Sequence, residues 1–176
     1  MRRGEIVEAA RLWLGTPYHH QASLQGIGCD CLGLVRGIWR DLLGEEPEAP
    51  PPYSPYWAES LRQETLATAA MRHLQPVAGG GERPGDVLLF RWREHLPAKH
   101  CAILSEPDRI IHAHDGAVVA EVAFTPWWRR HLSDAFLPRQ SRDRPLRGPD
   151  RLHQADLGRW PRTRREHRHD ARASRP

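Results

Sequence analysis

The sequence of 176 residues contains no run of about 18 apolar residues, and it therefore predicts no membrane-spanning helix. It also lacks an apolar stretch behind its charged start, residues 1–8, so we expect no secretory signal. Only three cysteines are present, which is an odd and closely grouped set that does not suit a disulfide scaffold: Cys29, Cys31 and Cys101. A reactive thiol or a metal site is the better starting hypothesis. With 39% hydrophobic and 27% charged residues, the chain is expected to fold, as one domain of ordinary size.

Lysine is nearly absent, because Lys99 is the only one among 26 basic residues. Residues 139–176 hold 12 arginines against 5 acidic residues, a surplus of 7, whereas the whole chain carries +4; residues 1–138 therefore carry −3. We expect a folded domain over 1–138 and an Arg/Pro-rich tail over 139–176, flexible or ordered by a partner. Nucleic-acid binding by this tail is disfavoured, because Trp160 is its only aromatic residue and no known module is evident.

Helical spacing of apolar residues dominates the first half of the chain. Residues 4–14 predict one helix, and a second, stronger pattern begins near Cys31 and ends at Gly44. Between them, residues 19–28 are predicted to be a loop. After a proline-rich surface connection over 45–57, a third helix is expected from Ser60 to Leu74, with Ser60 and Gln63 spaced as a capping box.

Short segments rich in Val, Ile, Leu and aromatic residues follow the turn at residues 84–85. Turn signals separate them, which predicts an antiparallel meander. The expected strands are 86–92, 99–104, 109–114 and 117–124, and residues 135–137 are the candidate for a closing strand. Helices followed by a meander indicate an α+β fold.

Cys31 lies at the first turn of the strongest predicted helix, directly after a loop. Unpaired backbone N–H groups and the positive end of the helix dipole stabilise a thiolate at such a position. Two interpretations are open at this point: a nucleophile, or a small buried hydrophobic residue, as free cysteines usually are. Cys29 suggests a regulatory bond or a metal pair, but Cys-x-Cys is poor spacing for zinc, so we expect no metal.

A thiolate nucleophile needs a base, and His100 and His112 lie on consecutive predicted strands. If the two strands are joined by the turn at 106–108, the numbers of residues that face each other across the hairpin add up to about 213. His100 then lies opposite residue 112, 113 or 114. A sum of 212 would make His100 and His112 direct neighbours on one face. His112 would then orient the ring of His100, while Cys101 would point to the other face and into the core. With 11 histidines in the chain, a chance pair is not rare, but apolar strand residues flank both of these.

Five motifs follow one another in order along the chain: GTPY at 15–18, DCLGLV at 30–35, PGDVLLF at 84–90, HCAIL at 100–104 and IHA at 111–113. Each alone is weak, but together they are specific. In this arrangement the sequence resembles the NlpC-type peptidoglycan cysteine peptidases, which have a papain-like fold. The resemblance covers residues 5–137.

The resemblance implies a catalytic triad. Cys31 would attack the peptide carbonyl, His100 would act as general base and then acid, and His112 would orient His100. Tyr18 and Asp30 match family positions associated with the substrate pocket and the oxyanion region. The implied substrate is the stem peptide of peptidoglycan, cleaved between γ-D-glutamate and the diamino acid, with no metal or organic cofactor.

The sequence also departs from the family's pattern. Leu32 stands where the family usually has serine, which removes a hydroxyl near the site. We expect the protein to have neither a secretory signal nor wall-binding repeats. In this it resembles the members of the family that are found in phage tails and gene-transfer-agent particles. By that analogy the protein is made in the cytoplasm, joins tail or baseplate proteins and acts in the periplasm without inserting into a membrane.

Alternative functions and secondary sites remain open. One rival is an amidase or acyltransferase on the same fold, and another is a catalytically silent structural or wall-binding module, which the retained triad residue types disfavour. Asp86 follows Pro-Gly before a strand, so a turn role is favoured over an active-site role. The segment from Trp127 to Arg130 could stack on glycan, although a packing role is at least as well supported.

Overall fold

A computed structural model of the chain describes residues 2–54 and 63–138. Its N-terminal half is mainly helical, with a two-stranded hairpin between the first two helices, and the strands of one large sheet follow. In chain order the elements are α1 (Arg3–Leu12), β1 (Ser23–Leu24), β2 (Gly28–Cys29), α2 (Cys31–Leu43), α4 (Thr65–His73), β3 (Leu74–Val77), β4 (Val87–Phe90), β5 (His100–Glu106), β6 (Arg109–His112), β7 (Ala120–Ala123), α5 (Pro126–His131) and β8 (Leu132–Pro138). This arrangement confirms the α+β class.

The large sheet has six strands in the order β3-β8-β4-β5-β6-β7, and all its neighbouring pairs are antiparallel. The predicted meander is present as β4 to β7. The candidate closing strand is longer than expected, and it returns beside β4 instead of extending the meander from β7. The edge strand β3 was not predicted; it contains Pro76, and residues 75 and 76 are exposed, so no buried apolar run marks it.

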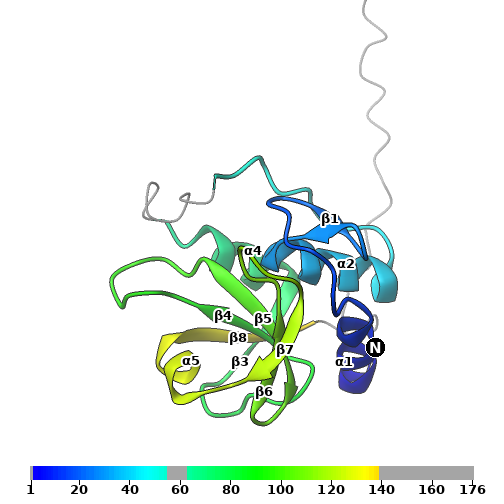
Figure 1. The fold of residues 1–176 in the computed structure, drawn as a ribbon. Coiled ribbons are helices and arrows are strands. Elements are labelled where there is room, and N and C mark those ends of the chain that lie inside the picture. The colour runs from blue at the N-terminus through cyan, green and yellow to red at the C-terminus, as the bar shows by residue number, and fades with distance from the viewer. Residues whose placement is uncertain (1, 55–62, 139–176) are drawn as a thin grey trace, which may run out of the picture. The chain divides into compact units, whose positions relative to one another are not determined.

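Alternating side chains of the central strands form a core on each face of the sheet. In Figure 1, α1, α2 and α4 lie along one side of the sheet and α5 lies toward the other. The helix-facing core includes Val87, Leu89, Cys101, Ile103 and Ile111. The opposite core contains Leu88, Phe90, Ala102, Leu104 and Ile110, and Trp128 of α5 packs against it. Cys101 therefore lies in the core, as the alternation predicted, and the face on which it lies is the one covered by α1, α2 and α4.

The helices differ from their predicted limits mainly at one place. α2 runs from Cys31 to Leu43, and Gly44 caps its end as predicted, with a positive φ of 82° that suits glycine. α4 begins only at Thr65, after an N-cap residue, Glu64, whose side chain makes no capping bond. The capping box was expected at Ser60, which lies outside the described residues. Two short elements were missed: the β1–β2 hairpin inside the predicted loop, and the six-residue helix α5.

Close contact between α1 and α2 depends on a glycine. A Cβ atom at Gly37 would lie 2.0 Å from Cζ2 of Trp13, the buried indole at the end of α1. Only glycine lets α2 approach the end of α1 this closely, so the position of α2 relative to α1 depends on Gly37.

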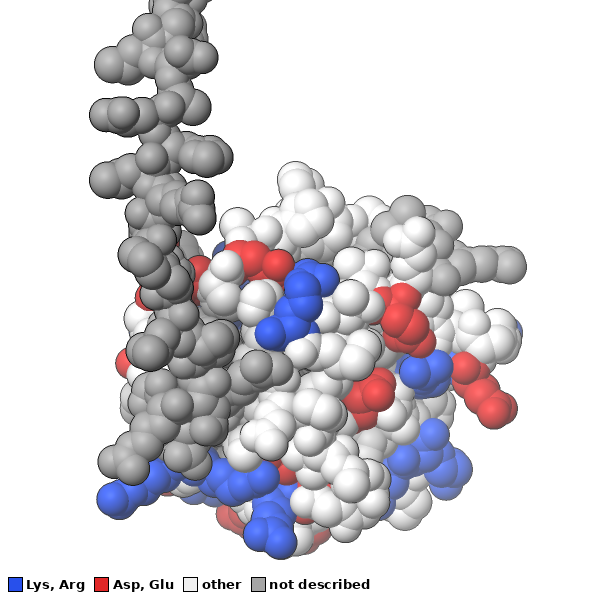
Figure 2. Space-filling model, turned by 180° about the vertical axis from the view of Figure 1, so that it is seen from behind, with Lys and Arg blue, Asp and Glu red and all other residues white. Residues whose placement is uncertain are grey.

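Charges on the face opposite to that of Figure 1 are mixed in sign. Figure 2 shows acidic and basic side chains separated by uncharged residues, with basic side chains recurring along the lower edge of the view. Such a surface gives no extended field of one sign over that face. Among the described residues, no helix is long and apolar enough to cross a membrane.

Candidate active site

The start of α2 is held in place by hydrogen bonds from the preceding loop. Asp30 caps the helix, since its Oδ1 accepts a bond from the backbone N–H of Gly33 at 2.7 Å. A Cβ atom at Gly33 would lie 1.9 Å from the carbonyl oxygen of Ala22, so the loop packs directly on the first turn. Cys31 is the first residue of the helix and is half-buried. Its sulfur thus sits at a rigid helix N-terminus, where the helix dipole favours a thiolate.

His100 begins β5 and His112 ends β6, and both side chains are 6% exposed. Nε2 of His100 lies 3.0 Å from Nδ1 of His112. The register lies within the expected range but is not the one that would pair the histidines directly: Ile103 pairs with Ile111 and Leu104 with Ile110, so paired numbers sum to 214, not 212. An irregularity between residues 104 and 106 shifts the pairing near the turn. The histidines are consequently diagonal neighbours on one face, not direct partners, and still meet.

The protonation state of the pair follows from burial. Burial, and then the charges of His100 and His114, lower the pKa of His112 to about 3. His112 is therefore neutral near pH 7. Nε2 of His100 and Nδ1 of His112 share one hydrogen bond, whose donor is set by the tautomers of the two rings. This bond leaves Nδ1 of His100 as the ring nitrogen for the thiol.

The thiol of Cys31 is surrounded by groups that favour its ionised form. Its pKa lies well below the ordinary value because the side chain of Cys101 donates a hydrogen bond to it and because His100 provides charge and a further hydrogen bond, against the effect of burial. The pKa of Cys101 lies well above the ordinary value, chiefly because of the same hydrogen bond with Cys31. Cys101 therefore stays a thiol and Cys31 becomes the thiolate. Sequence reasoning placed Cys101 in the core but missed this contact.

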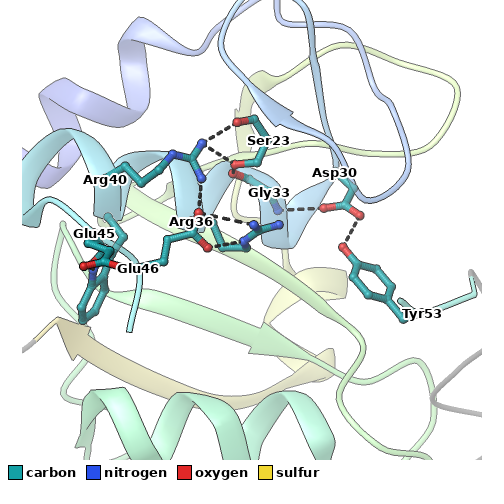
Figure 3. A network of polar contacts seen from close by, with 9 residues as sticks. Ser23, Asp30, Gly33, Arg36, Arg40, Glu45, Glu46 and Tyr53 are labelled. Carbon is teal, nitrogen blue, oxygen red and sulfur yellow. Dashed lines mark hydrogen bonds and ion pairs between the residues drawn. The ribbon is translucent and has the colours of Figure 1, made fainter. Parts of the chain in front are cut away.

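Asp30 is buried, and both of its carboxylate oxygens are engaged within the chain. Oδ1 accepts the bond from Gly33, and Oδ2 accepts a bond from the hydroxyl of Tyr53 at 2.5 Å, as Figure 3 shows. Oδ2 also accepts a bond from the backbone N–H of Gln21 at 2.7 Å. Tyr18 is half-buried nearby, and its backbone forms a bridge with Cys29. Burial, then the negative charges of Asp30 and Cys31, raise the pKa of Tyr18 to about 12, so its phenol stays protonated.

Tyr53 belongs to the proline-rich connection, which was predicted to be a plain surface segment. Its backbone carbonyl accepts bonds from Nε2 of Gln21 at 2.7 Å and lies 2.7 Å from Nε2 of His20. Together with the Tyr53–Asp30 bond, these contacts hold the segment against the loop before Cys31. Nothing in the sequence signalled this, because the bond joins residues 23 positions apart outside any periodic pattern.

Indole rings enclose the histidines on the face of the sheet opposite to α1, α2 and α4. Trp92 and Trp128 each stack on His100, with ring centroids 5.7 and 5.6 Å away, and Trp128 also meets the edge of His112. Trp128 therefore has a packing role. Trp127 is 45% exposed and stacks on His131, and glycan binding by it stays a prediction.

The remaining candidate residues lie away from this arrangement. Asp86 is buried; it pairs with Arg3 and accepts a bond from the backbone N–H of Arg83, which is the turn role that the sequence favoured. All three cysteines are free, so Cys29 forms no disulfide. Within residues 2–54 and 63–138, no group of three or more metal-binding side chains is found.

The geometry defines a papain-like α+β protein with a thiolate at a helix N-terminus beside a histidine pair on a sheet. Residues 15–136, more than half of the sequence, match the NlpC/P60 family, and the chain belongs to that family. Its members are cysteine peptidases that hydrolyse peptidoglycan, and the chain is an enzyme of this class. A search of curated proteins finds no match.

Solved structures share the fold at low sequence identity. The NlpC/p60 domain of the peptidoglycan hydrolase SagA is 20% identical, with a TM-score of 0.55 over 77% of this chain and 98% of that domain. An NlpC/P60 family protein from Bacillus cereus is 20% identical, with a TM-score of 0.57 over 78% of this chain. NlpC2 from Trichomonas vaginalis is 19% identical, with a TM-score of 0.54 over 77% of this chain. The chain spans less than half the length of these last two, 41% and 46%.

Proposed function

We propose that the protein is a cysteine endopeptidase that cuts the stem peptides of peptidoglycan between γ-D-glutamate and the diamino acid. The observation that carries the proposal is the 3.0 Å contact between His100 and His112, next to a thiol whose pKa is lowered. A base oriented by a second group, beside an activated thiol, is the arrangement that nucleophilic acyl transfer requires.

In the proposed reaction the Cys31 thiolate attacks the scissile carbonyl carbon, and the oxyanion is received by backbone N–H groups at the start of α2. Protonated His100 gives a proton to the departing amine, so the C–N bond breaks and a thioester remains. His100 then takes a proton from water, whose hydroxide attacks the thioester and returns the thiolate. Neutral His112 holds the His100 ring through the Nε2–Nδ1 bond throughout.

In this proposal Asp30 and Tyr18 shape the site and take no part in the bond changes themselves. Asp30 caps α2 and so fixes the N–H groups that face the oxyanion, while Tyr18 keeps its phenol protonated and packs against the same core as Cys31. Incorporation into a phage-tail or gene-transfer-agent particle, with tail or baseplate proteins as partners, stays a prediction.

The decisive experiment is mass spectrometry of diaminopimelate-type peptidoglycan after digestion by the wild type, Cys31→Ala and His95→Ala. His95 is exposed and lies outside the site, so His95→Ala serves as the matched control. New fragments from the wild type and the control alone would support the peptidase, and their masses would identify the bond. Fragments that map to an amide outside the peptide would favour the amidase alternative. No fragments together with an unreactive Cys31 would favour a silent structural module.

A further inference from the structure

Exposed aliphatic side chains gather where the end of α1 meets the β1–β2 hairpin. The part of the chain that the structure describes has seven exposed large hydrophobic residues, and five of them belong to this group: Leu12, Leu14, Leu24, Ile27 and Val118. Each of the five is between 42% and 69% exposed. We call these five residues the aliphatic patch.

Backbone contacts hold the three segments of the patch together as one surface. The carbonyl of Leu12 accepts a hydrogen bond from Nε2 of Gln25, in the hairpin turn, at 2.7 Å. The N–H of Gly15, in the loop after α1, donates to the carbonyl of Val119 at 2.9 Å. Every member of the patch lies within two residues of one of these bonds. The exposed side chains therefore belong to a single area of the surface.

The chain around the patch carries no formal charge. Residues 12–29 contain no Asp, Glu, Lys or Arg, and this is the longest such stretch in the sequence. With 27% charged residues overall, a stretch of 18 residues would hold about five. Residues 116–120 are uncharged as well. Depletion of charged residues is the feature of composition that distinguishes the centre of a protein interface from ordinary surface.

The size and composition of the patch fit a second copy of this chain. Five aliphatic residues exposed to this degree present roughly 300–500 Å², which is the size of the largest apolar patch on an ordinary monomer. A standard interface buries about 800 Å² per partner, and about 65% of it is apolar in homodimers, or roughly 500 Å². Interfaces between different proteins are no more apolar than the remaining surface. The patch therefore supplies most of the apolar area that one half of a homodimer needs.

We propose that the aliphatic patch is the interface of a symmetric homodimer, in which the hairpin and the end of α1 of one protomer pack against those of its partner. A two-fold axis places the same surface opposite itself, so an uncharged patch needs no oppositely charged partner surface. No residue of the patch takes part in the proposed reaction, so the interface is a property of the protein beyond that function. The contact is of modest area, and we expect a dissociation constant in the micromolar range.

The test is sedimentation equilibrium of the full chain from micromolar to near-millimolar concentration. The wild type should change from monomer to dimer over this range. Ile27→Asp buries a carboxylate in the contact and brings two like charges together, so it should weaken dimerisation about tenfold or more. Leu24→Asp repeats the change at a second position of the hairpin. Both residues are exposed, and thermal unfolding should show that both variants fold.

Met71→Asp is the matched control. Met71 is 54% exposed on α4 and lies outside the patch, so the same change there should leave the dissociation constant unaltered. Because the readout is mass and not activity, the result is independent of the proposed peptidase function.

Several results would overturn the proposal. A wild type that remains monomeric up to near-millimolar concentration would show that the patch does not bind a second copy. A dimer that survives both Ile27→Asp and Leu24→Asp, or that Met71→Asp weakens equally, would show that the contact lies elsewhere. Masses that rise beyond the dimer would contradict a two-fold contact, because such a contact closes after two chains.

Discussion

Acid should destabilise this domain through one buried imidazole. His112 has a pKa of about 3 in the folded chain, because it is buried beside two other histidines, against 6.5 for a histidine in water. Below pH 6.5 the unfolded chain binds a proton at this position that the folded chain does not bind. The free energy of unfolding therefore falls as the pH falls, by about 1.4 kcal/mol per pH unit, until about pH 3 is reached.

Between pH 7 and pH 4.5 this single group should cost about 2.5 kcal/mol. Urea denaturation of the wild type and of His112→Asn at both pH values measures it, because the variant lacks the titrating ring. The wild type should lose about 2.5 kcal/mol more than the variant over this interval, whereas His95→Asn, which changes an exposed histidine, should behave like the wild type. Equal losses in the wild type and His112→Asn would refute the assignment of a buried, neutral His112.

Two further changes test the packing and the charge of the site. Cys101→Val removes the hydrogen bond to the Cys31 thiolate and should raise the pKa of that thiol. The pH profile of iodoacetamide alkylation should then move to higher pH. Cys101→Ser keeps a hydrogen-bond donor and should move the profile less. A profile that Cys101→Val leaves unchanged would show that the bond does not stabilise the thiolate. Gly37→Ala places a methyl group 2.0 Å from a buried indole and should cost about 1–3 kcal/mol in urea denaturation; Gly79→Ala, with open space around it, is the control.

Local pattern was enough to predict much of the site. Period-3.6 spacing placed Cys31 at the start of a helix, and period-2 alternation placed Cys101 in the core on the face opposite to His100. The second of these predictions said only that Cys101 points away from the face of His100 and into the core; that this face is the one covered by α1, α2 and α4 is a result of the tertiary structure. Both predictions depend only on neighbours within a few residues, where backbone geometry fixes the direction of each side chain. The expected strands around His100 and His112 followed from the same rule.

Tertiary structure decided what local pattern could not. Beside the histidines, paired residue numbers in β5 and β6 sum to 214, which differs by two from the sum that would pair the histidines directly. Because the side-chain period of a strand is also two, both rings still lie on one face. Contacts between residues far apart in sequence were equally hidden: the Tyr53–Asp30 bond and the return of β8 beside β4. Sequence by itself therefore determined which residue types were available and which way each points. Only packing determined which of them meet, because a contact between distant segments depends on the position of every element between them.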